Sequence, residues 1–147
     1  VSTSLKNLMG RELKGIPSKS IIITCAKELW FHKGRSDTKR PKTEGFSRNS
    51  RMFNVNWIAN TTKGTNNYAP CSTLIYLYDQ HPNPLILNWL RPDHHRTFVR
   101  DYALAELIQW VCRSRIRNGE PITVYIPSRR MREIFSNWLN SLEYQDH

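Results

Sequence analysis

The stretch of sequence that decides the fold is TFVRDYALAELIQWVCRSR, residues 97–115. Apolar residues recur in it at helical spacing and predict a helix over Thr97–Arg115 with one broad apolar face. Trp110 falls just outside that face, beside Ala103 and Glu106. A large flat ring in this place either covers the edge of the core or stacks on another flat group, and both interpretations stay open. The predicted face consists of Phe98, Tyr102, Leu104, Ala105, Leu107, Ile108, Val111 and Cys112.

Composition and charge limit the classes of protein to which the chain can belong. Its 147 residues, 39% of them hydrophobic and five of them tryptophan, suit one domain with its own core and no metal or disulfide staple. The formal net charge of +10 favours a polyanionic partner, most simply RNA or DNA, over a surface that is basic only for solubility.

Cysteine spacing and hydropathy bear on the compartment. Cys25, Cys71 and Cys112 are too few and too widely spaced for a disulfide framework or a zinc site, which favours a reducing compartment. We find no signal peptide and no apolar run that could span a membrane, so no membrane partner is predicted. Because the chain begins with Val, we expect residues 1–147 to be a single domain cut from a longer polypeptide.

The rest of the chain predicts a series of strands before the long helix and a strand and a helix after it. A helix is expected over Ser2–Leu13, and Ser128 is expected to cap the last helix, which follows Pro127. Gly34–Ser50 is polar and basic and is expected to be an exposed loop, and Asn118-Gly119 ends the long helix. The predicted strands are Ser20–Ala26, Glu28–Lys33, Arg51–Ile58, Cys71–Tyr78, Leu85–Leu90 and Ile122–Ile126.

This order predicts an α+β domain with a mixed, mostly antiparallel sheet packed against one long helix, and with a C-terminal helix. Parallel strands need long crossover connections, usually helices. Since the predicted early strands lack such helices, an all-parallel Rossmann arrangement is not expected.

No catalytic signature is present: the chain has no glycine-rich phosphate loop, no Gly-x-Ser-x-Gly and no Cys-x-x-Cys. We therefore predict no catalytic residues, no metal site, no cofactor and no enzymatic activity. His94-His95 beside Asp93 fits a solvated loop better than a metal site. A metal-dependent nuclease remains an alternative, and it would have to assemble its carboxylates from distant positions, namely Asp79, Asp93, Asp101 and Glu106.

Aromatic residues interleaved with positive charge are better represented than catalytic groups. Bases stack on such rings, while Lys and Arg attract phosphates. We expect most of these rings to lie in the core and two or three to face a ligand. The rings are Trp30, Trp57, Tyr68, Tyr76, Tyr78, Trp89 and Trp110, and the cations are Lys33, Arg35, Lys63, Arg91 and Arg96.

The order of predicted elements resembles the cap-binding domain in the basic polymerase subunit of influenza-like viruses (orthomyxoviruses). The resemblance covers residues 20–115 and lies in pattern and spacing, with few identities. The matching segments are Leu29-Trp30-Phe31-His32-Lys33, the basic loop 34–50, the alternating segment 52–58, Ser72-Thr73-Leu74-Ile75-Tyr76-Leu77-Tyr78, Leu85-Ile86-Leu87 and the long helix.

The resemblance implies that the domain binds the 5′ cap of host mRNA for primer capture (cap snatching) in viral transcription. A methylated guanine would lie between Trp57 and Trp110 as a cation–π sandwich, with Tyr78 beside it. Lys63, Arg91 and Arg96 would contact phosphates. The implied partners are capped RNA, viral RNA and the other subunits of the viral RNA polymerase, in the host cell nucleus and in the virion.

The chain departs from the family where the guanine edge is held. The expected glutamate is missing from Asn60-Thr61-Thr62-Lys63, which implies a divergent, tick-borne-type member in which cap binding is weakened or lost. The alternatives are a generic RNA- or DNA-binding domain, a metal-dependent nuclease, and a structural domain that docks on other subunits.

Overall fold

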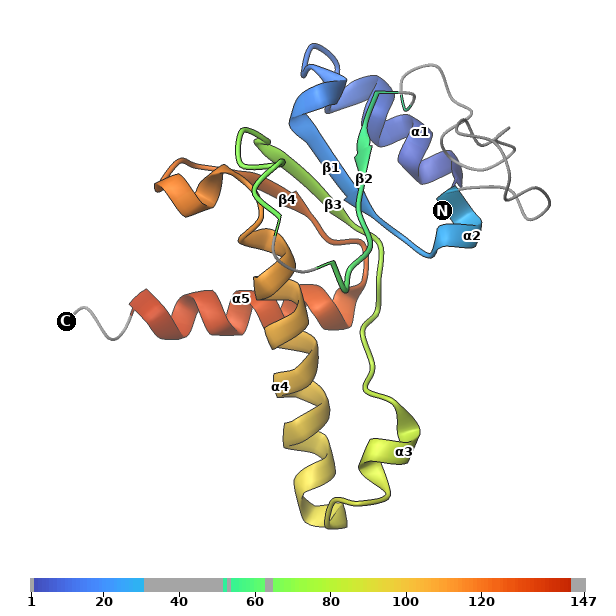
Figure 1. The fold of residues 1–147 in the computed structure, drawn as a ribbon, viewed down its shortest axis with the longest axis vertical. Coiled ribbons are helices and arrows are strands. Elements are labelled where there is room, and N and C mark those ends of the chain that lie inside the picture. The colour runs from blue at the N-terminus through green and yellow to red at the C-terminus, as the bar shows by residue number, and fades with distance from the viewer. Residues whose placement is uncertain (1, 31–51, 53, 63–64, 144–147) are drawn as a thin grey trace.

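The centre of the fold is a sheet of four parallel strands (Figure 1). The computed structural model of the chain describes residues 2–30, 52, 54–62 and 65–143. The strands are β1 (Ile21–Thr24), β2 (Asn56–Trp57), β3 (Thr73–Tyr76) and β4 (Thr123–Tyr125), and they follow the order β2-β1-β3-β4 across the sheet. β1 and β3 occupy the middle, and every residue in both is buried, as expected of parallel strands that are covered on two faces.

Helices cover both faces of this sheet (Figure 1). On one face, α1 (Ser2–Arg11) and α2 (Lys27–Trp30) enclose a core that contains Leu5, Met9, Ile21, Ile23, Trp30 and Ile75. On the other face, α4 (Pro92–Val111) and α5 (Arg129–Glu143) enclose a core that contains Ile22, Leu74, Tyr76, Ala103, Leu107, Trp110, Val111 and Met131. The short α3 (Pro84–Leu87) and the 3-10 turns η1 (Ser18–Ser20) and η3 (Arg115–Asn118) complete the order of elements.

The prediction of a mostly antiparallel sheet packed on one long helix is therefore wrong. All strand pairs are parallel, and several helices share the covering of the sheet. The prediction failed because two crossover segments were interpreted as strands. Residues 28–30 of the predicted strand Glu28–Lys33 belong to α2, and its last three residues lie outside the described chain. The predicted strand Leu85–Leu90 begins inside α3.

A capping signal explains why Leu85–Leu90 is not a strand. The Asn83 side chain accepts a hydrogen bond of 2.9 Å from the Leu85 amide, and Pro84 occupies the first turn of α3. Asparagine as N-cap followed by proline favours a helix start over an extended strand. The strand predicted over Arg51–Ile58 is confirmed only at Asn56–Trp57, and the basic loop 34–50 lies outside the described residues.

Other elements agree with the sequence. The structure places helices and strands in the predicted segments Ser2–Leu13, Ser20–Ala26, Cys71–Tyr78, Thr97–Arg115 and Ile122–Ile126. The Ser128 hydroxyl accepts a hydrogen bond from the Met131 amide at 3.3 Å, which confirms its predicted role as the cap of α5. None of the helices in the described part of the chain combines the length and the apolar character needed to cross a bilayer.

The buried face of α4 differs from the predicted one by a rotation about the helix axis. Its four buried residues are Ala103, Leu107, Trp110 and Val111, whereas Ala105 is exposed. Trp110 is fully buried, and its ring meets Tyr76 of β3 edge to face, with ring centroids 5.3 Å apart. Of the two interpretations of Trp110, the structure supports a core residue.

Candidate functional site at the carboxyl end of the sheet

The strand order creates a switch point between β1 and β3. The chain leaves β1 toward β2 at one edge of the sheet and leaves β3 toward β4 at the other edge. In open α/β sheets, the crevice outside the carboxyl ends of two such strands is where ligands bind. Thr24 and Tyr76 are the last residues of these strands and lie opposite each other in the register. The geometry of the fold therefore makes these two residues candidates for contact with a ligand.

Thr24 and Tyr76 carry buried hydroxyl groups with no hydrogen-bond partner among the described residues. Both side chains are fully buried. The Nε1 of Trp110, whose ring contacts Tyr76, is likewise buried and unpaired. A buried polar atom without a partner costs about 1–3 kcal/mol, so several of them close together are unusual in a packed core.

Side chains from α4 and from the chain after β3 surround the Tyr76 phenol. Burial is the main reason why the pKa of Tyr76 lies well above its ordinary value, and the negative charge of Glu106 adds to the effect, as do Tyr78 and Tyr102. Tyr78 contacts Tyr76 with ring centroids 6.1 Å apart, and burial also raises its pKa. Tyr76 is therefore a neutral phenol that can donate a hydrogen bond at physiological pH.

A polar network ties three segments together just beyond the strand ends. Arg130 of α5 donates from Nη1 to Asp79 Oδ1 at 2.7 Å and to the Gln80 carbonyl at 2.9 Å. Asn60, which follows β2, donates to the Gln80 side chain at 2.8 Å. Partial burial raises the pKa of Asp79, but Arg130 and His81 outweigh that effect, so the pKa lies below its ordinary value. The network links β2, β3 and α5 at the carboxyl end of the sheet.

The start of α5 brings positive charge to the same end of the sheet. Its first residues are Arg129, Arg130, Met131 and Arg132, and its first turn contains no acidic residue. This reverses the usual preference, because the positive end of a helix dipole favours acidic side chains. The Nη2 of Arg130 is buried and unpaired among the described residues. Phosphates and carboxylates commonly bind at helix starts of this kind.

The thiol of Cys25, directly after β1, does not add a nucleophile to this site. Burial raises the pKa of Cys25 to about 11, partly opposed by a hydrogen bond with Trp57. The thiol is therefore protonated at neutral pH, and the thiolate is the nucleophilic form. Within the described ranges, no group of three or more His, Cys, Asp or Glu side chains could hold a metal ion.

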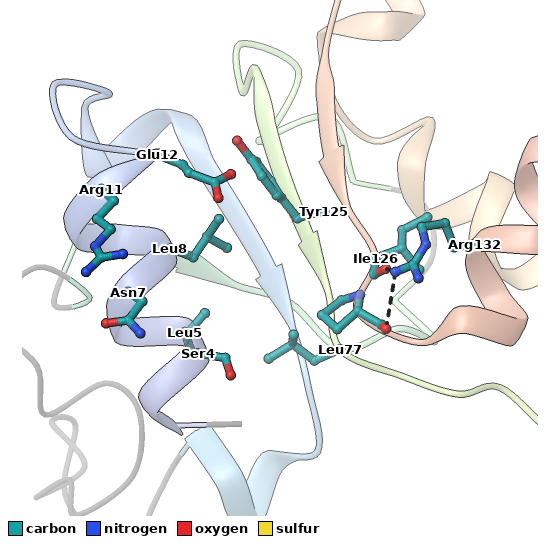
Figure 2. A pocket seen from close by; sticks show the side chains of 11 residues that line it. Ser4, Leu5, Asn7, Leu8, Arg11, Glu12, Leu77, Tyr125, Ile126 and Arg132 are labelled. Carbon is teal, nitrogen blue, oxygen red and sulfur yellow. Dashed lines mark hydrogen bonds between the residues drawn. The ribbon is translucent and has the colours of Figure 1, made fainter.

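A cavity of about 600 Å³ lies on the opposite face of the sheet, between α1 and strands β3 and β4 (Figure 2). In Figure 2, Leu77 and Tyr125 line it from the sheet side and Leu8 from α1. Arg132 lines the cavity at the carboxyl end of β4, where it donates to the carbonyl oxygens of Ile126 at 2.8 Å and Pro127 at 3.3 Å. The full lining is Ser4, Leu5, Asn7, Leu8, Arg11, Glu12, Leu77, Tyr125, Ile126, Pro127 and Arg132.

The structure does not bring the predicted cap-binding rings together. Trp110 belongs to the core under α4, whereas Trp57 packs against the core under α1 and donates from Nε1 to the Cys25 carbonyl at 3.1 Å. The sheet lies between the two indoles, so they cannot clamp one base. Tyr78, the third residue predicted to contact the cap, follows β3, and its ring centroid lies 6.1 Å from that of Tyr76.

The predicted phosphate contacts are spread over the molecule. Arg91 and Arg96 are exposed at the start of α4, and Lys63 lies outside the described residues. His94 is exposed and lies 3.8 Å from Asp93, but both residues belong to the start of α4 and not to the solvated loop that was predicted for them. Sequence reasoning missed Thr24, Arg130 and the depth of Tyr76, because a parallel strand order was needed to bring them to one end.

The sequence of the chain identifies its family. The sequence profile of the YonV C-terminal Rossmann-like domain matches residues 1–139. The chain belongs to this family. A relative from Bacillus subtilis (strain 168), the SPbeta prophage-derived uncharacterized protein YonV, is 36% identical over 89 residues, which are 60% of this chain and 22% of that protein. The chain thus spans less than a quarter of the relative's length, and no solved structure matches it.

Membership of this family corrects the earlier resemblance. The chain is not a cap-binding domain of an orthomyxovirus polymerase, and cap snatching for viral transcription is not its function. Its relative is a bacterial prophage protein, so the host cell nucleus and the virion are wrong as locations. The parallel sheet, with helices on both faces, agrees with the Rossmann-like description of the family.

Proposed function

We propose that this Rossmann-like domain binds a phosphorylated ligand of the nucleotide type at the carboxyl end of its sheet. The observation that carries the proposal is the pair of buried hydroxyl groups of Thr24 and Tyr76 at the switch point, neither of which has a hydrogen-bond partner in the described part of the chain. A ligand whose polar edge reaches these hydroxyl groups at the strand ends would supply the missing hydrogen-bond partners.

The charge at the start of α5 supports a phosphate as the anionic part of the ligand. Arg129 is exposed, and Arg130 is fixed toward the strand ends by Asp79. Met131 belongs to the same core as Tyr76, which places the first turn of α5 in the layer that contains the hydroxyl groups. A phosphate at the helix start and a sugar or base at the hydroxyl groups would lie on one side of the sheet.

The proposal concerns binding and includes no reaction. The protonated Cys25 thiol is a poor nucleophile, and the carboxylate of Asp79 is engaged by Arg130. The polar groups at this end of the sheet are suited to donating and accepting hydrogen bonds.

Calorimetric titration of the 147-residue chain with ATP, GTP, CTP and UTP tests the proposal, with pyrophosphate as the ligand that lacks a base. We expect Thr24→Val and Tyr76→Phe each to weaken nucleotide binding by about 10-fold, the effect of one lost hydrogen bond to a ligand. Pyrophosphate binding should be weakened by Arg129→Ala and left unchanged by both hydroxyl variants.

Tyr125→Phe is the matched control. It removes a phenol oxygen from β4 on the opposite face of the sheet, where Tyr125 packs against the α1 core. Its nucleotide affinity should equal that of the wild type. Failure of the wild-type chain to bind any of these ligands at about 1 mM, a concentration at which even weak specific sites are occupied, would reject the proposal.

A further inference from the structure

The segment between β3 and the middle of α4 forms an arm that leaves the body of the molecule. In Figure 1 the chain runs from β3 away from the sheet to α3, turns, and returns along α4. The buried residues of α4 are Ala103, Leu107, Trp110 and Val111, all in its second half. None of the residues in α3 and in the first half of α4 is buried, and most of them are exposed to solvent.

The tip of the arm exposes large apolar side chains, above all one indole. Trp89 is 90% exposed, Leu85 66% and Ile86 44%. Isolated apolar residues at the surface need no explanation, but three within five positions form a patch that indicates an interaction site. The tryptophans predicted to face a ligand were Trp57 and Trp110, which are half-buried and buried, whereas the exposed one is Trp89.

Local hydrogen bonds hold this tip in a defined shape. Asn83 caps α3, the Trp89 amide donates to the Ile86 carbonyl at 3.1 Å, and the His95 ring lies 2.9 Å from the Leu90 carbonyl. The turn thus presents the indole without burying it. Because the backbone that carries Trp89 is already ordered, ligand binding loses less conformational entropy there than it would on a flexible loop.

Cationic side chains follow the indole along the arm. Arg91, with its side chain 81% exposed, lies 3.7 Å from Asp93, and Arg100 pairs with Asp101 at 2.9 Å. Arg96 is exposed and forms no hydrogen bond or ion pair with the residues that the structure describes. Over residues 77–101 three arginines are balanced by three aspartates, so Arg96 is the cation beside the exposed indole that has no acidic partner among the described residues.

We infer that the arm binds single-stranded nucleic acid, with a base stacked on Trp89 and the neighbouring phosphates on Arg91 and Arg96. Stacking on an exposed ring next to arginines is the common mode of sequence-tolerant binding. A membrane surface fits less well, because α3 has four residues and presents no long apolar helix face of the kind that lies in a lipid interface. This site is separate from the one proposed at the strand ends.

Fluorescence anisotropy with a labelled oligonucleotide of about 15 bases tests the inference, and the intrinsic tryptophan emission is read in parallel. We expect Trp89→Ala to weaken binding by about 5- to 150-fold, while Trp89→Phe retains part of the affinity. Nucleic acid should quench the wild-type tryptophan emission and not that of Trp89→Phe. Arg96→Ala should lower the slope of log affinity against log salt by about 1.

Trp138→Phe is the control for fluorescence and affinity, because it removes an indole from α5 that stacks on Phe135 at a centroid distance of 5.8 Å. Thr24→Val should leave oligonucleotide binding unchanged, which separates this surface from the nucleotide site. Equal affinity of Trp89→Ala and the wild type would overturn the inference. So would binding to vesicles of anionic lipid that depends on Trp89, in the absence of oligonucleotide binding.

Discussion

Replacing Tyr76 by phenylalanine should stabilise the ligand-free protein. The phenol of Tyr76 is fully buried and has no partner among the described residues, so folding removes its hydrogen bonds to water without replacing them. The unpaired hydroxyl group therefore costs about 1–3 kcal/mol, and the small cavity left in Tyr76→Phe offsets part of the gain from removing it. We expect the free energy of unfolding to rise by about 1 kcal/mol and the Tm by about 2–4 °C.

Urea denaturation followed by circular dichroism measures this change. The midpoint should rise while the m value stays constant, since the substitution leaves the buried area nearly unchanged. Tyr125→Phe, on the other face of the sheet, should leave the midpoint within error. A decrease in stability of about 1 kcal/mol for Tyr76→Phe would show that the hydroxyl has a partner and would refute the reasoning.

The pH dependence of the same variant gives a second result with a definite sign. The pKa of Tyr76 is raised in the folded chain, chiefly by burial. Above the ordinary pKa of 10.0, the unfolded chain loses this proton while the folded chain keeps it. The stability of the wild type should therefore fall as the pH rises above 10.0, and the advantage of Tyr76→Phe should widen over the same range.

Three further predictions concern single positions. Ser128→Ala removes the oxygen that accepts from the Met131 amide and should lower the unfolding free energy by about 1 kcal/mol, measured by thermal denaturation. Cys25→Ala should flatten the fall in stability between pH 9.0 and about 11, because the raised pKa of the thiol contributes up to about 1.4 kcal/mol per pH unit there, measured by urea titrations across that range. Gly119→Ala should destabilise by about 1 kcal/mol in the same denaturation assay, since Gly119 has a φ of 75° at the end of η3.

The sequence was sufficient to predict individual elements but not the direction of the strands. Short-range patterns in the sequence predict the strand over the β-branched run Ile21–Ile23 and the helices α4 and α5. The structure confirms these elements. Strand direction depends on the connections. Residues 85–90 include apolar side chains that are exposed in the arm. From the sequence alone, a short apolar run of this kind is interpreted as a buried strand, because residue types do not reveal exposure.

The candidate site was harder to predict for the same reason. Thr24 and Tyr76 are about fifty residues apart, and nothing local marks either as functional. Trp110 lies just outside the predicted apolar face, and the true buried face is turned about the helix axis so that Ala103 and Trp110 join Leu107 and Val111. In the structure, Ala103 allows α4 to approach the strands closely, and Trp110 then fills the space beside Tyr76.

The order of the strands also bears on how the chain is made. β1 finds its inner partner β3 about fifty residues later, and β3 finds β4 after about fifty more. In a chain emerging from the ribosome, the backbone groups of these hydrophobic strands therefore stay unpaired until a strand about fifty residues later has been made. Pairing between such distant segments slows folding. A chain terminated before residue 123 would leave β3 as an open edge, and such an edge recruits strands from other molecules into aggregates.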